Sequence, residues 1–430
     1  MNKEELFHSL KFGLFIHWGL SSIPGREWNM HYTCKTREDC ENYEKYMNYF
    51  CPDKFNPEEW ADMAWNAGMR YVVFTTKHHE GFCMFDTKYT DYKITNSPYG
   101  KDITKMLVDA FRAKGFKIGL YYSLFDWHQP EYHIDHLHPL RHLPKDEAIA
   151  ENNKRDMKVY TKYLYNQVEE LMTNYGEIYE LWFDNTLDPN PNYPYLKGKY
   201  RDAWDSDNLV KMIRKYQPNI FINNRLDLED NFDFLSCEQG IPKENPVYKG
   251  QKMIWEECQT YNDSWGYFRD SGANRTFKNL LAMLVETASK GGNFLFNIGP
   301  TPRGQFEPYA KELLAKFAKW IDLNGESIYG CTEAPKDYIH WASDVFLTYS
   351  KEKNRLYAHL LDYPGNGYVA FTDPNNKIEF ARFLHDHSEL KINDKDTFGD
   401  NAIGSNKLLS FQYVKDPGVE IPVVEIFLKD

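Results

Sequence analysis

Short apolar segments alternate with amphipathic segments through roughly the first three quarters of the chain. The strand-like segments lie at 12–18, 71–77, 117–123, 179–184, 220–225, 234–239, 252–258 and 292–299. Segments with apolar residues at helical spacing separate most of them, beginning near 57, 102, 154, 209, 277 and 308. Asn56 and Asp102 are suited to cap two of these helices, and Gly115 to end one. Eight strands with intervening helices predict a (β/α)8 barrel, irregular between the sixth and seventh strands.

The pattern changes from about residue 333 onward. "DVFLTYS", "NRLYAHLL", "GYVAFT" and "VVEIFL" alternate as strands do, and "YPGNG", "DPNN" and "DPG" are typical of turns. We therefore expect two domains, a catalytic barrel at 1–332 and an antiparallel β-sandwich at 333–430.

Composition narrows the possible partners. The 430 residues carry a net charge of −12 without a basic stripe, so we do not expect nucleic acid to bind. No run of 18 apolar residues predicts a membrane span. The first residues do not resemble a signal peptide, so we expect a cytoplasmic protein, unless a leader has been removed.

Seven cysteines without a CxxC pair favour reduced thiols. Aromatic residues reach 16%, a surplus that suits a sugar-binding cleft.

Polar and aromatic side chains stand at the end of every predicted strand. They are His17 and Trp18, His78 and His79, Tyr121 and Tyr122, Asp184, Asn223 to Arg225, Glu238, Trp255 and Glu256, and Asn297. In such barrels the active site lies at the carboxyl ends of the strands. The buried strand "YELWFD" thus delivers Asp184 to a mouth where His, Tyr and Arg side chains offset the cost of burying its charge.

Two reaction classes compete for this set of residues. Glycoside cleavage needs one carboxylate as nucleophile or base and another as acid, with His, Asn, Arg and aromatic rings to hold the sugar. Metal-dependent hydrolysis needs a close ligand cluster. Adjacent His78 and His79 should point to opposite sides of a strand. The segment "HIDHLHPLRH" at 133–142 is the other histidine-rich candidate for metal.

The ordered segments "FGLFIHWG", "REW", "KHHEGFCMFDTKYTDY", "LWFDN", "NNR", "WEECQTYNDSWGY" and "GGNFLFNIGPTPRGQ" identify a family. Spanning about 12 to 305, they resemble the retaining α-L-fucosidases. The resemblance implies an irregular (β/α)8-like barrel followed by a β-sandwich. It also implies hydrolysis of terminal α-L-fucose from a fucosylated glycan through a covalent intermediate, with no cofactor and no metal.

Residue by residue, the resemblance implies that Asp184 is the nucleophile. The residues that would hold the fucose hydroxyls and ring are His17, Glu27, Trp28, His78, His79, Tyr121 and Arg225. Trp182 would lie beside the nucleophile, and Phe15, Tyr121 and Trp265 would shelter the sugar's methyl group. A methyl group prefers such an aromatic pocket, where a CH2OH group would lack a partner.

The acid/base is assigned by counting on from Arg225 to Glu238 in "LSCEQG". Glu256 is the fallback, although we favour for it the role of a structural acid hydrogen-bonded under the site. Two other functions stay open: a catalytically weak fucose-binding protein, and a metal-dependent barrel hydrolase that uses the histidines of 133–142. The sequence does not predict an oligomeric state.

Overall fold

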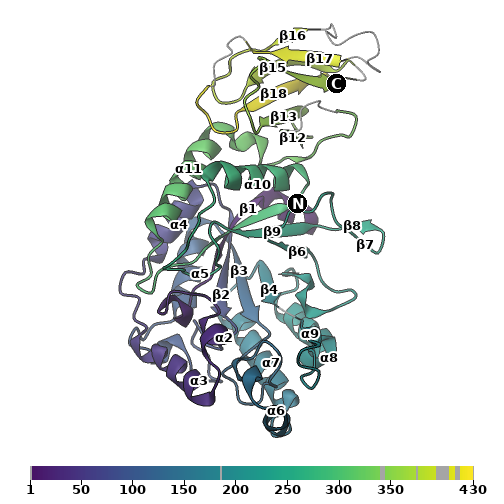
Figure 1. Ribbon diagram of the computed structural model, residues 1–430. Coiled ribbons are helices and arrows are strands. Elements are labelled where there is room, and N and C mark those ends of the chain that lie inside the picture. Colours follow the sequence, from purple (N-terminus) through teal and green to yellow (C-terminus); the bar gives the residue numbers. More distant parts are fainter. Residues whose placement is uncertain are drawn as a thin grey trace.

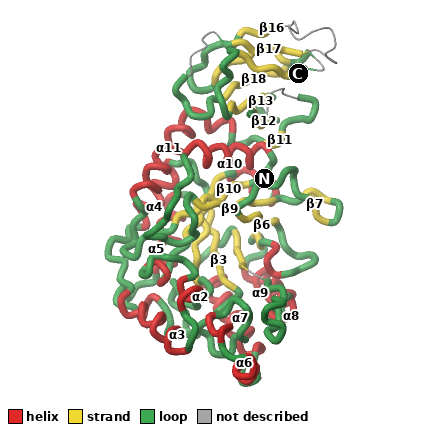
Figure 2. The backbone as a smooth tube through the Cα atoms, viewed as in Figure 1, coloured by secondary structure: helices red, strands yellow, loops and turns green. Residues whose placement is uncertain are grey.

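An eight-stranded parallel sheet forms the centre of the protein (Figures 1 and 2). The computed structural model describes residues 2–184, 186–338, 344–373, 376–393, 406–411 and 417–429. The sheet order is β5 (Phe221–Ile222), β4 (Glu180–Asp184), β3 (Lys117–Ser123), β2 (Tyr71–Lys77), β1 (Phe12–Ile16), β10 (Asn293–Ile298), β9 (Trp255–Thr260) and β6 (Leu235–Glu238). An isolated parallel bridge between Asn223 and Phe234 links its two edges, so the curled sheet approaches a closed barrel.

Helices cover the outside of this sheet (Figure 1). The described helices are α1 (Lys3–Leu10), α2 (Asn29–Thr33), α3 (Arg37–Glu44), α4 (Pro57–Asn66), α5 (Ile103–Lys114), α6 (Lys145–Asn152), α7 (Met157–Asn174), α8 (Arg201–Trp204), α9 (Ser206–Tyr216), α10 (Phe277–Ser289) and α11 (Pro308–Asn324). The predicted caps form: Asn56 and Asp102 each accept a backbone hydrogen bond at 3.0 and 2.8 Å. Gly115 ends α5 with a φ of 108°, which glycine adopts without strain.

Alternation along each strand separates two cores. Leu14, Leu181 and Phe183 point outward into the large core between sheet and helices. Phe15 and Trp182 point inward and belong to a separate aromatic cluster in the barrel interior. Because side chains alternate across a strand, His17 shares the inward side of Phe15, and Asp184 shares that of Trp182. The strand pattern therefore aims both polar groups into the barrel.

Two predicted strands have the wrong bounds. The segment 220–225 supplies only the two residues of β5, and Asn224–Leu226 form a 3-10 turn that carries Arg225. The segment 252–258 begins its strand late, because Val247–Tyr248 (β7) and Gln251–Lys252 (β8) form a separate hairpin. Strand β9 therefore runs from Trp255 to Thr260, and Glu256 lies near its beginning rather than at its end.

The C-terminal part contains two antiparallel sheets, as predicted. One has the order β11 (Thr332–Glu333), β12 (Val345–Ser350), β13 (Arg355–Leu360), β18 (Val423–Leu428) and β15 (Ile378–Phe383). The other has the order β14 (Tyr368–Thr372), β17 (Asn406–Ser410) and β16 (Lys391–Asn393). Residues of both sheets share one apolar core, and the sheets lie beside α10 and α11 (Figure 1).

The predicted domain boundary between residues 332 and 333 falls inside β11, both of whose residues pair with β12. The first strand of the C-terminal sheets thus begins one residue before the predicted boundary, and it precedes the first strand predicted there, "DVFLTYS". The turn segments "DPNN" and "DPG" lie partly outside the described residues.

All seven cysteines are free thiols. None of the helices that the structure describes has the length and apolar character needed to cross a bilayer.

Candidate active site

A cavity of about 210 Å³ lies at the carboxyl ends of the barrel strands. At about 30 Å³ per water molecule, this equals the volume of roughly seven waters, a space for a small ligand. Of the residues predicted to form a site, the ones that line it are Phe15, His17, Glu27, Trp28, His78, His79, Tyr121, Trp182, Asp184, Glu238 and Trp265. Arg225 does not line the cavity but contacts Asp184, Glu238 and Trp182, which do. Glu256 does not line it either.

Asp184 at the end of β4 is held by two donors. The Tyr121 hydroxyl donates to its Oδ2 at 2.9 Å, and Nη1 of Arg225 lies 3.5 Å from its Oδ1. Nε2 of His79 lies 3.7 Å from Oδ2, which is close but too long for a hydrogen bond. A phenol and a guanidinium therefore stabilise this carboxylate at the cavity wall.

Glu238 at the end of β6 faces the same cavity. Nη2 of Arg225 donates to its Oε2 at 3.1 Å, and Nε of Arg225 donates to Ser236. Burial raises the pKa of Glu238, the charge of Asp184 raises it further, and Arg225 acts in the opposite direction. One guanidinium thus bridges the two carboxyl groups, and the raised pKa of Glu238 favours its protonated form.

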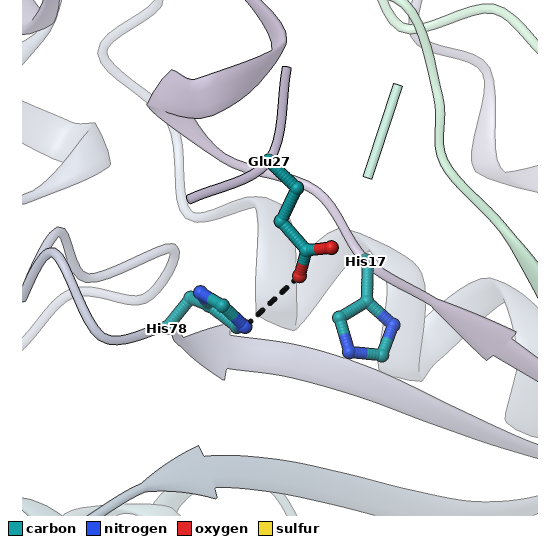
Figure 3. A group of neighbouring side chains, drawn as sticks. All are labelled: His17, Glu27 and His78. Carbon is teal, nitrogen blue, oxygen red and sulfur yellow. Dashed lines mark ion pairs between the residues drawn. The ribbon is translucent and has the colours of Figure 1, made fainter. Parts of the chain in front are cut away.

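Glu27 and His78 form an ion pair at another part of the cavity (Figure 3). His78 Nε2 lies 3.2 Å from Glu27, and Nδ1 lies 3.5 Å from Glu80. Burial by itself lowers the pKa of His78, but the hydrogen bonds and charges of Glu27 and Glu80 raise it to about 10. His78 is consequently a cation at neutral pH. The second oxygen of Glu27 accepts the backbone N–H of Trp265 at 3.0 Å.

The other two histidines are neutral. Burial lowers the pKa of His17 to about 4, and burial together with the charge of His78 lowers that of His79 well below its usual range. Nδ1 of His17 donates to Asn297 at 2.6 Å, and Nδ1 of His79 donates to Ser123 at 2.6 Å. In both rings Nε2 is therefore left as an acceptor, suited to a ligand hydroxyl.

The expectation that His78 and His79 point to opposite sides is wrong. Strand β2 ends at Lys77, and the chain turns immediately after it. Both rings line the cavity, with their centroids 4.1 Å apart. The alternation rule holds only inside a strand, and the two histidines lie one and two residues beyond its end.

Aromatic rings form much of the cavity wall. Phe15 lies 5.5 Å from Trp182 and 6.2 Å from Trp265 between ring centroids, and Tyr121 stacks on Trp182 at 5.9 Å. Trp28 packs edge-on against His79 at 4.9 Å. Such faces bind the apolar side of a sugar or a methyl group.

Trp28 adopts a left-handed backbone conformation with φ of 57° at the start of α2. A bulky residue in this region is strained, and such strain concentrates at ligand sites. The conformation turns the indole toward the cavity, next to the buried Glu27.

Glu256 lies beneath the site and not at its mouth. Its Oε2 accepts the hydroxyl of Tyr71 at 2.6 Å, and its Oε1 accepts the indole N–H of Trp182 at 3.1 Å. Burial raises its pKa to about 7 in spite of these two donors. Glu256 is thus hydrogen-bonded under the site, in the position that we favoured from the sequence. It is not a strand-end residue, because the predicted strand began three residues before β9.

Two lining residues, Leu137 and Cys258, were not singled out from the sequence. Cys258 follows Glu256 by two residues in β9, so the alternation of a correctly placed strand would have aimed it inward. Leu137 belongs to the histidine-rich segment 133–142 and is the residue of that segment that lines the cavity, and no periodic pattern marks it.

The histidines of 133–142 do not gather around a common point. His133 contacts the carbonyl of Arg155 at 3.1 Å, and Nδ1 of His138 accepts the N–H of Leu140 at 3.0 Å. Among the described residues, the one group of three potential metal ligands is His17, Glu27 and His78. A protonated His78 has no lone pair for a metal, because both of its nitrogens face carboxylates.

The family assignment follows from sequence comparison. The family model of α-L-fucosidase matches residues 1–326. The chain belongs to the α-L-fucosidase family. Human tissue α-L-fucosidase is 30% identical over 395 residues, which cover 86% of this chain and 78% of that protein.

Solved structures agree with this fucosidase assignment. α-L-Fucosidase isoenzyme 1 from Paenibacillus thiaminolyticus aligns with a TM-score of 0.88 and 38% identity, over 100% of this chain and 99% of that one. A GH29 α-L-fucosidase from Bacteroides thetaiotaomicron, trapped as a covalent intermediate with 2-fluoro-fucosyl fluoride in a Glu-to-Gln mutant, aligns with a TM-score of 0.80 and 26% identity, over 99% of this chain and 96% of that one. The fold is that of these fucosidases, a TIM-like domain followed by antiparallel sheets.

Proposed function

We propose that this family member is a retaining α-L-fucosidase, with Asp184 as nucleophile and Glu238 as acid/base, acting on fucosylated glycans. The observation that carries the proposal is the bridge that Arg225 forms between these two carboxyl groups at the cavity wall. Retaining glycosidases use two carboxyl groups, one that attacks the anomeric carbon and one that protonates the leaving oxygen.

The surroundings of Asp184 suit a nucleophile. Tyr121 and Arg225 each donate to one oxygen of its carboxylate, and together they fix the group against rotation. After attack, the ester bond to the sugar removes the negative charge. The same two donors are then available to the carbonyl oxygen of the leaving carboxylate when water breaks the intermediate.

The surroundings of Glu238 suit an acid that becomes a base. Burial and the charge of Asp184 raise its pKa, so it holds a proton for the leaving oxygen in the first step. Once Asp184 is esterified, its charge no longer favours that proton. Glu238 can then accept a proton from the attacking water in the second step.

The remaining groups suit a 6-deoxy sugar. The Nε2 atoms of His17 and His79 offer two acceptors, so that more than one sugar hydroxyl can be held at once. Phe15, Tyr121 and Trp265 form an apolar wall that suits a methyl group and leaves no partner for a CH2OH group.

The proposal is tested with an aryl α-L-fucoside. The wild-type protein should release the phenol, and NMR should show α-L-fucose as the first product. Asp184→Ala should lower turnover by several orders of magnitude with an unchanged circular dichroism spectrum. Azide should restore part of the activity of this variant and yield β-L-fucosyl azide, because the small anion enters from the face that Asp184 leaves open.

Two results would contradict the proposal. A wild-type protein that binds fucose without releasing the phenol would be a fucose-binding protein. An Asp184→Ala variant with near-native turnover would mean that another residue is the nucleophile.

A further inference from the structure

Glu256 connects the interior of the barrel to the floor of the active site. Its carboxyl group is buried and accepts two hydrogen bonds, one from Tyr71 and one from the indole N–H of Trp182. Strand β9 brings Glu256 and strand β4 brings Trp182, and these strands lie on opposite sides of the barrel. The hydrogen bond at 3.1 Å therefore ties the active-site indole to a distant strand across the barrel interior.

Trp182 in turn supports the groups that hold Asp184 and Glu238. The ring of Tyr121 stacks on the indole at 5.9 Å with an angle of 22° between planes. The guanidinium of Arg225 lies over the same indole at 5.2 Å from its centroid. Tyr121 donates to Asp184, and Arg225 contacts both carboxyl groups. A shift of the indole would displace both donors together.

We infer that Glu256 is a positioning residue of the fucosidase reaction, which acts through the indole of Trp182 on Tyr121 and Arg225. The inference rests on the proposed function, and it assigns Glu256 a part in the rate of the reaction beyond that of a buried structural acid. Removing its carboxyl oxygen leaves the indole N–H unpaired and the ring free to tilt. A displacement of about 1 Å in positioned groups costs about 100-fold in rate.

The chain offers a matched control in the same interior. Glu180 is also fully buried, and neither of its carboxyl oxygens has a hydrogen-bond partner within the described structure. It lies on β4 two residues before Trp182, at a deeper level of the barrel than the cavity. Glu180→Leu thus changes barrel packing and buried charge without removing an anchor of the indole.

The experiment compares four variants: Glu256→Leu, Glu256→Gln, Trp182→Phe and Glu180→Leu. Each is assayed on aryl α-L-fucosides with good and poor leaving groups, per active site titrated with 2-fluoro-fucosyl fluoride, and each is checked by thermal unfolding. Glu256→Leu should lower kcat/KM by about 100-fold on all substrates alike. Glu256→Gln should recover most of this loss, since its amide oxygen still accepts the indole N–H. Glu180→Leu should keep kcat/KM close to that of the wild type.

The double variant tests the route through the indole. In the Trp182→Phe background no N–H remains to be anchored, so Glu256→Leu should add little further loss, and the two effects should be strongly non-additive. If Glu256→Leu keeps native kcat/KM per active site, if Glu256→Gln is as slow as Glu256→Leu, or if the losses add in the double variant, the inference is wrong. Failure of the wild type to cleave any aryl fucoside would instead contradict the proposed function.

Discussion

The hydroxyl of Tyr121 donates a hydrogen bond of 2.9 Å to Oδ2 of Asp184. Tyr121 belongs to β3 and Asp184 to the neighbouring β4, so the register of two parallel strands sets this contact. Burial and the charge of Asp184 raise the pKa of Tyr121, and the phenol therefore keeps its proton and remains a donor at neutral pH.

Tyr121→Phe should slow the reaction without unfolding the protein. A hydrogen bond to a charged group contributes about 1.5–3 kcal/mol, which corresponds to roughly a 10- to 150-fold fall in kcat/KM. Tyr122→Phe is the control, because Tyr122 on the same strand points outward to Gln167 and touches no group of the site. Equal rates for the two variants would show that the contact with Asp184 has no part in the reaction.

Glu238 and Glu256 should differ in their dependence on the leaving group. Protonation matters most when the leaving oxygen is a poor leaving group, so Glu238→Ala should strongly impair cleavage of natural fucosides. It should spare the first step on an aryl fucoside with an acidic phenol, and azide should then accelerate breakdown of the accumulated intermediate to α-L-fucosyl azide. Steady-state and burst kinetics with a series of phenols measure both effects.

Glu256→Ala should slow all members of that phenol series to a similar degree, without azide rescue. Its carboxyl group lies under Trp182 and is not part of the cavity lining. If leaving-group dependence and azide rescue appear with Glu256→Ala and not with Glu238→Ala, the two roles must be exchanged.

The site residues whose positions follow from strand alternation could be predicted from the sequence. The inward position of Phe15 and Trp182 predicts that His17 and Asp184 enter the barrel, and the structure brings them to one cavity. These positions follow from a local rule of period two. The eight strand segments similarly predict the barrel. The four strand segments and three turn segments after residue 333 predict the C-terminal sheets, because each strand is a short run bounded by turn residues.

The predictions from the sequence were wrong for residues whose positions depend on tertiary contacts. Whether β9 starts at 252 or at Trp255 depends on pairing with β10 and β6, and a shift of three residues moved Glu256 from beneath the site to its mouth. The orientation of His78 and His79 depends on a turn after β2. Leu137 reaches the cavity through the folding of a long loop, and neither periodicity nor spacing encodes such a contact.

Prolonged chelation should leave the activity unchanged. The proposed mechanism requires only two carboxyl groups, and the cationic His78 has both nitrogens directed at Glu27 and Glu80. Activity is measured after dialysis against a chelator and again after adding back zinc, with metal content determined in parallel. Loss of activity that zinc restores would contradict this prediction and would indicate a metal site at His17, Glu27 and His78.

His78 should make stability depend on pH. Its pKa of about 10 in the folded protein lies above the usual value near 6.5 of an unfolded histidine. The stabilisation from its cation is therefore fully present below pH 6.5 and is lost as pH rises through 10. The difference in unfolding free energy between wild type and His78→Gln should shrink over this range, as urea unfolding can measure. A constant difference would mean that His78 is not charged in the folded protein.

The charge of Asp184 should control the proton of Glu238. Burial raises the pKa of Glu238 first, the carboxylate of Asp184 raises it further, and Arg225 counteracts both. Asp184→Asn removes the negative charge and leaves Arg225 to Glu238 alone, so the pKa of Glu238 should fall. Trapping Asp184 as its 2-fluoro-fucosyl ester should lower it too, since the ester is neutral. NMR titration of 13C-labelled glutamate carboxyl groups, assigned with Glu238→Gln, measures the shift.

Glu27→Gln provides the comparison for this last prediction. The Glu27 carboxylate also raises the pKa of Glu238, but it comes after Asp184 and Arg225 in the size of its effect. Its removal should therefore lower the pKa of Glu238 by less than Asp184→Asn does. If the pKa of Glu238 stays unchanged or rises in Asp184→Asn, the charge of Asp184 does not control the protonation of Glu238. Glu238 would then lack the means to serve as acid in the first step and as base in the second.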